Sequence, residues 1–102
     1  MYICVMADDQ NNDTYELSNG QIAALIGARF RDYRTALGLT QKEVAFQSGV
    51  SVMTIVRFEK GHGNAIRLDN LIALMRAIQR LDDIAGVVRE MPQSLYHKKE
   101  RR

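Results

Sequence analysis

The sequence holds a single cysteine, two histidines, one proline and no tryptophan. Cys4 lies far from both His62 and His97, so the chain has no zinc-finger spacing and cannot form an internal disulfide. No apolar run approaches the roughly 18 residues that span a bilayer, and Met1 to Met6 lacks the basic residues of a signal peptide. We therefore expect a soluble, cytoplasmic protein that needs no metal or other cofactor.

The sequence also lacks a catalytic constellation. A nucleophile needs a base within reach, and neither Cys4 nor the histidines lie in a context that indicates activation. The adjacent Asp82 and Asp83 are more typical of a capped or solvated helix than of an acid-base pair. The segment Gly61 to Gly63 is not preceded by the strand that a phosphate-binding glycine loop requires. These absences argue against an enzyme.

Charge is distributed unevenly along the 102 residues. The net charge is +2, but residues 1–20 carry four acidic residues and no Lys or Arg. Residues 21–102 therefore hold 14 Lys and Arg against 8 Asp and Glu. A chain of this length suits one globular domain, and its basic part suits a polyanionic partner.

The hydrophobic pattern predicts an all-α fold. Ser18 with Gln21 forms a capping box for a helix from about Asn19 to Leu37, which Gly38 ends. The apolar residues of this helix recur at helical spacing. They are Ile22, Leu25, Ile26, Phe30, Tyr33 and Leu37.

Two short helices follow. Thr40 and Glu43 form a second capping box, and Gly49 ends that helix after about two turns. Ser51 caps the next helix, and Gly61 closes it. Such a pair is typical of the helix-turn-helix, whose second helix enters the DNA major groove. The residues expected to pack between the two helices are Val44, Ala45, Val50, Ile55 and Phe58.

A fourth helix is predicted from the apolar spacing between Leu68 and Ile78. A fifth segment continues it through Leu81, Ile84 and Val87, and Pro92 ends that segment at the latest. Five segments then stand in a distinctive order: Gly27 to Arg31, Leu37 to Gln41, Val44-Ala45, Ser48 to Ser51, and Phe58 to Gly61.

This order resembles the XRE family, the Cro/C1-type phage repressors, over about residues 20–85. The resemblance implies a five-helix, lambda-repressor-like DNA-binding domain at residues 18–91. The polar tract from Asp8 to Thr14 predicts a flexible N-terminal arm at residues 1–17, which would act as a tether or, alternatively, as a strand exchanged in a dimer. A basic C-terminal tail is expected at residues 92–102. The chain departs from the family pattern at Ser48, where a buried apolar residue is common, and at Phe46, where a polar residue is usual. Either Phe46 faces a partner or the packing is rearranged.

The resemblance also implies a DNA-binding surface. Gln41 would contact a phosphate or a base, and the groove-facing residues of the recognition helix would be Ser51, Val52, Met53, Thr54 and Arg57. Helical spacing independently turns Val52, Met53 and Arg57 away from the core. Arg57 is the main candidate for base readout because a guanidinium can bind guanine O6 and N7 together; a phosphate contact is the alternative. Core contact is the alternative for Val52 and Met53.

The loop after this helix, where comparable domains meet the sugar-phosphate backbone, contains Lys60, His62, Asn64 and Arg67. A solvated loop histidine is the alternative for His62. In similar repressors the positions of Arg34 and Glu59 pair across the domain, which implies a structural salt bridge.

One recognition helix reads only a few base pairs, so we expect a homodimer on double-stranded DNA. Its interface would contain Leu81, Ile84, Val87 and Val88, unless that segment folds back as a fifth core helix. The predicted function is sequence-specific DNA binding by an autoregulating transcriptional repressor. Residues 81–95 also resemble the HipB-like antitoxins, so an antitoxin acting mainly on a toxin protein is the alternative. A restriction-modification controller is another role within the XRE family.

Overall fold

The computed structural model describes residues 14–62 and 65–92, and these residues form five helices and no strand. The all-α, five-helix class is therefore confirmed. The predictions for residues 1–13, for Asn64 and for residues 93–102 lie outside the described ranges. The helices are α2 (Asn19–Ala36), α3 (Gln41–Ser48), α4 (Val52–Glu59), α5 (Leu68–Ala77) and α6 (Leu81–Ala85).

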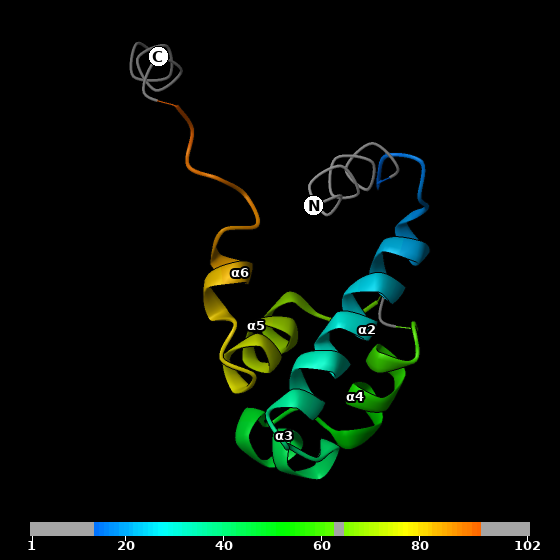
Figure 1. The fold of residues 1–102 in the computed structure, drawn as a ribbon, viewed down its shortest axis with the longest axis vertical. Helices are drawn as coiled ribbons and strands as arrows, with labels where there is room; N and C mark the ends of the chain where they lie inside the picture. The colour runs from blue at the N-terminus through cyan, green and yellow to red at the C-terminus, as the bar shows by residue number, and fades with distance from the viewer. Residues whose placement is uncertain (1–13, 63–64, 93–102) are drawn as a thin grey trace, which may run out of the picture.

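The helices pack in a chain of neighbours. α2 packs on α4, α3 contacts both α4 and α5, and α5 packs on α6. Figure 1 shows α4 and α6 at opposite sides of the molecule, with α2 and α5 between them. None of the described helices has the length and hydrophobicity needed to cross a membrane.

Polar side chains fix the starts of the first three helices. The Ser18 hydroxyl accepts a hydrogen bond from the Gln21 amide, and the Gln21 side chain accepts one from the Ser18 amide. Thr40 and Glu43 make the same reciprocal pair at α3, and Ser51 caps α4. These bonds satisfy amides that have no partner inside the helix. Both predicted capping boxes are confirmed.

The core is apolar and lies where α2, α3, α4 and α5 meet. The rings of Phe30 and Phe58 lie 5.2 Å apart at 58°, so they join α2 to α4 in a tilted arrangement favourable for aromatic pairs. The buried apolar side chains are Phe30, Val44, Val50, Ile55, Phe58, Leu74 and Ile78.

Gly27 sets the distance between α2 and α4. A Cβ atom at this position would lie 2.0 Å from the carbonyl oxygen of Phe58, far inside a van der Waals contact. Only glycine lets the two backbones approach this closely. The close approach places the end of α4 directly against α2.

The apolar face that the spacing defines on α2 is only partly buried. Phe30 lies in the core, but Ile26, Tyr33 and Leu37 are each about 40% exposed, at 39%, 44% and 43%. α4 covers one side of α2, and a groove of about 470 Å³ remains on the side facing α5 and α6. The helical period identifies an apolar face but does not show how much of it a neighbour covers.

α6 is held against α2 by Arg80. Its guanidinium makes two hydrogen bonds to Asp83, at 2.9 and 2.8 Å, and lies 5.0 Å from the centre of the Tyr33 ring. The hydrogen bond and the negative charge of Asp83 raise the pKa of Arg80 above its usual value. The helix ends at Ala85, before Gly86, so it does not continue through Val87 as the spacing had indicated.

Candidate nucleic-acid interface

The turn between α3 and α4 has the helix-turn-helix geometry. Gly49 ends α3 with a φ of 76°, a left-handed conformation that glycine adopts without steric cost. Val50 follows and is buried, at 4% exposed. The Ser48 hydroxyl accepts a hydrogen bond from the Val50 amide at 3.1 Å. Ser48 therefore stabilises the turn, which explains a polar residue where an apolar one is common.

The outer face of α4 combines apolar and cationic side chains. Ile55 and Phe58 point into the core, while Val52 and Met53 are 38% and 60% exposed. Arg57 is exposed one turn after Met53, on the same side of the helix. The exposure of Met53 favours contact with a partner surface, whereas Val52, at 38% exposed, is mostly covered by the domain itself.

The start of α4 presents a hydroxyl pair. The Ser51 hydroxyl accepts from the Thr54 amide at 3.1 Å and donates to the Thr54 hydroxyl at 2.9 Å. Ser51 is therefore occupied as the helix cap. The half-buried Thr54 keeps its own hydroxyl proton, which can be donated to an outside acceptor.

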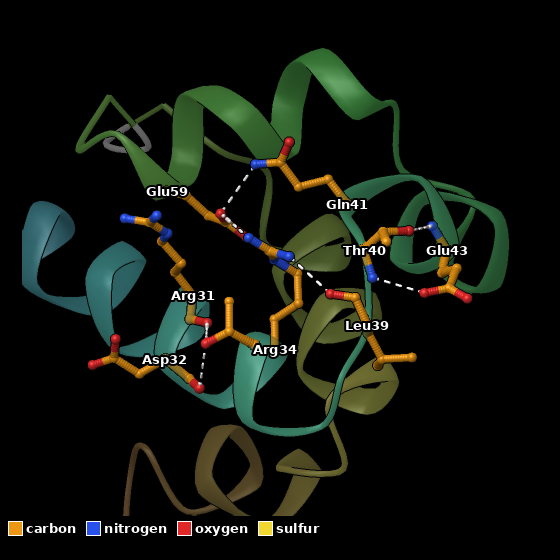
Figure 2. Close-up of polar contacts among 9 residues, drawn as sticks. Arg31, Asp32, Arg34, Leu39, Thr40, Gln41, Glu43 and Glu59 are labelled. Carbon is orange, nitrogen blue, oxygen red and sulfur yellow. Dashed lines mark hydrogen bonds and ion pairs between the residues drawn. The ribbon is translucent and has the colours of Figure 1, made fainter.

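A buried salt bridge fixes the end of α4 to α2 (Figure 2). Arg34 donates from Nε and Nη2 to the two carboxylate oxygens of Glu59, at 2.6 and 2.9 Å. Its Nη1 donates to the backbone carbonyl of Leu39 at 2.8 Å. The two side chains are 10% and 4% exposed. The carboxylate thus lies between one helix of the scaffold and the end of α4.

Gln41 joins this network from the start of α3. Its Nε2 donates to the Glu59 carboxylate at 3.1 Å, and the side chain is half-buried. The residue was expected to contact DNA, and the structure also gives it a link between α3 and α4. One amide proton and the side-chain oxygen remain for an outside partner.

Two exposed cationic residues lie close to Glu59 in the sequence. Arg57 and Lys60 are exposed, and neither side chain forms an ion pair within the described residues. His62 is exposed too, and its backbone amide donates to the Arg57 carbonyl at 2.8 Å. The charge of both cations is therefore available to a polyanion.

Sequence reasoning missed one cationic residue beside this surface. Arg31 is exposed on α2, one turn before Arg34, and lines the same cleft as Glu59 and Lys60. The signal was available, because residues three apart on a helix lie on one face. The expected pairing of Arg34 with Glu59 also placed this face of α2 against the end of α4, so Arg31 could have been included.

The residues predicted for a dimer interface fall into two groups. Leu81 and Ile84 are half-buried on α6. Val87 and Val88 lie beyond the helix and are 71% and 82% exposed. The four residues therefore combine a partly covered helix with two exposed apolar side chains.

A family comparison agrees with this geometry. The sequence model of the family Helix-turn-helix, HTH_3, matches residues 30–83, which contain α3, the turn and α4 in full. The chain belongs to this XRE-type helix-turn-helix family, a class of DNA-binding domains of transcription regulators. No curated protein and no solved structure gave a significant match.

Proposed function

We propose that this protein is a sequence-specific regulator that binds double-stranded DNA as a homodimer and represses its own promoter. The observation that carries the proposal is the outer face of α4. There, exposed Met53 lies one turn from Arg57, which has no ion pair within the described residues, on a helix whose end is fixed by the Arg34–Glu59 salt bridge. A rigid helix with this face fits the major groove.

The proposed reading surface has two chemical parts. Arg57 offers a planar pair of donors for guanine, and Val52 and Met53 offer apolar contact for the methyl group of thymine. The Thr54 hydroxyl and the free amide proton of Gln41 add donors at the edges. Ser51 contributes through the cap that orients the first turn of α4.

Contacts to the DNA backbone come from the loop after α4 in this proposal. Lys60 and His62 are exposed there, and Asn64 follows outside the described residues. Such contacts fix register on the duplex without carrying sequence information. A protein that relies on them binds DNA more weakly as salt rises.

We propose a homodimer because one recognition helix is too short to read a complete DNA site. A single eight-residue helix reads only a few base pairs, and a two-fold pair doubles the sequence read. Leu81, Ile84, Val87 and Val88 supply apolar surface for such a pair. Val87 and Val88 are adjacent and exposed directly after α6, and no other pair of adjacent exposed valines occurs in the described residues.

An electrophoretic mobility shift of the purified full chain tests the proposal. The probe is DNA from the region upstream of its own gene, with random-sequence DNA as competitor and salt varied from about 50 to 200 mM. Specific binding that loses about 10³- to 10⁵-fold in affinity over this range, as about six to ten phosphate contacts require, supports the proposal. Binding that random DNA competes equally well contradicts the sequence specificity.

A second candidate function, an antitoxin that binds a toxin protein, is favoured by Phe46. This ring is 91% exposed on α3, on the side opposite buried Val44, so the packing of α3 is not rearranged around it. Aromatic side chains are enriched in protein–protein interfaces. Co-expression with the product of the neighbouring gene tests it, because a stoichiometric complex that Phe46→Glu dissociates would establish a protein-binding role.

A further inference from the structure

The groove of about 470 Å³ between α2, α5 and α6 is lined mainly by apolar side chains. Phe30 and Ile78 form its buried floor, whereas Ile26 and Tyr33 on the α2 wall remain 39% and 44% exposed. Figure 1 shows α6, which contributes to one edge of the groove, on the opposite side of the molecule from α4. The groove is therefore an apolar surface distinct from the proposed DNA-reading face.

The rim of the groove carries positive charge. Its lining contains Arg29 and Arg80, and its one carboxylate belongs to Asp83. Asp83 accepts two hydrogen bonds from Arg80, at 2.9 and 2.8 Å. Arg29 is exposed and forms no ion pair within the described residues. The groove therefore suits an apolar segment that is joined to negative charge.

The N-terminal part of the sequence has this combination. Residues 1–6 are all apolar or aromatic and carry no charge, and they lie outside the described residues. The tract after them contains Asp8, Asp9 and Asp13, and residues 1–20 hold no Lys or Arg. A DNA backbone would repel this tract, whereas Arg29 would attract it. Charge therefore favours the groove over the DNA-reading face.

The chain is long enough to bring residues 1–6 to the groove. A turn at residues 14–17 holds the described chain near the start of α2. From that start, Ile26 lies about 10 Å along the helix axis and Tyr33 about 21 Å. The eight steps from residue 14 back to residue 6 can span up to about 26 to 29 Å when extended. The linker can therefore return alongside α2 without the help of a second copy.

We propose that residues 1–6 dock in this groove of their own chain, with the acidic tract beside Arg29. Docking would cover the exposed parts of Ile26 and Tyr33. It would also remove from water an uncharged apolar segment of six residues, a length that favours aggregation when exposed. The contact lies within one chain and is independent of the proposed DNA binding.

Cys4 reports on the docking because it is the only cysteine of the chain. The rate at which iodoacetamide modifies its thiol is followed by mass spectrometry in the full chain and in the free peptide of residues 1–15. Ile26→Gln removes apolar surface from the groove. Leu37→Gln is the matched control, because Leu37 is 43% exposed at the end of the same helix and does not line the groove. Circular dichroism checks that both variants are folded.

In the wild-type chain, Cys4 should react about tenfold more slowly than in the peptide, as expected for a segment docked about nine-tenths of the time. Leu37→Gln should retain this protection, and Ile26→Gln should approach the rate of the peptide. Arg29→Gln should raise the rate at low salt. Its effect should disappear at about 1 M salt, where the Debye length is about 3 Å.

Two results overturn the inference while the proposed function stands. In the first, Cys4 reacts as fast in the full chain as in the peptide. In the second, Ile26→Gln and Leu37→Gln change the rate equally, which would place the protecting contact outside the groove.

A mixing experiment identifies the chain that supplies the groove. Ile26→Gln protein is equilibrated with an excess of Cys4→Ser protein, which has an intact groove but no thiol. Docking within one chain predicts that Cys4 of the Ile26→Gln protein stays reactive in the mixture. Renewed protection would assign the segment to the groove of a second copy and overturn the inference.

Discussion

Arg34 and Glu59 form a two-pronged salt bridge, with Nε to Oε2 at 2.6 Å and Nη2 to Oε1 at 2.9 Å, across 25 positions of the chain. The pair joins α2 to the last residue of α4. Gln41 adds a third element by donating to the same carboxylate. The orientation of the proposed recognition helix therefore depends on a buried charge and its partner.

Arg34→Met should destabilise the fold by about 3 to 5 kcal/mol, because it leaves the Glu59 carboxylate buried without its cation. The double variant Arg34→Met with Glu59→Met removes both charges and should lose clearly less. Urea denaturation followed by circular dichroism measures all three proteins. A double variant at least as unstable as Arg34→Met would contradict the view that the unpaired charge is the main cost.

Gly27→Ala should destabilise the fold by about 3 kcal/mol, since its Cβ would meet the Phe58 carbonyl and push α2 from α4. Gly20→Ala is the matched control on the same helix, where the nearest atom to a new Cβ lies at 3.9 Å. Alanine favours the helix, so this control should be neutral or more stable. Thermal melts compare the melting temperatures of the two variants. Equal changes would contradict a steric clash between a Cβ atom at position 27 and the Phe58 carbonyl.

The starts of α2, α3 and α4 were predictable because local chemistry sets them. Ser18, Thr40 and Ser51 predict the starts of three helices, and Gly49 predicts the turn between the two short helices. Each signal lies within a few residues of its effect. The order of these signals was enough to predict the helix-turn-helix before any tertiary contact was known.

The long-range contacts were less predictable. The resemblance implied the pairing of Arg34 with Glu59, but nothing indicated that Gln41 would share the carboxylate. Periodicity placed Tyr33 on the apolar face of the helix, and it lies 44% exposed beneath Arg80. A repeat of 3.6 residues defines a face, while the partners of that face depend on how distant helices pack.

Val88→Glu should dissociate the proposed homodimer while leaving the monomer folded, because Val88 is 82% exposed in the single chain. A charge at an apolar interface is costly to bury. Phe46→Glu is the control, since that ring is 91% exposed on α3. Sedimentation equilibrium reports the mass of each variant. Dissociation by Phe46→Glu alone would move the interface to α3.

The proposed function requires that the outer face of α4 reads DNA bases, and the variant Arg57→Ala removes the side chain expected to do so. Affinity is measured by mobility shift on the upstream DNA and on random DNA at one salt concentration. We predict a loss of about 1 to 3 kcal/mol on the specific site and a much smaller loss on random DNA. Equal losses on the two DNAs would reduce Arg57 to a phosphate contact and contradict the claim.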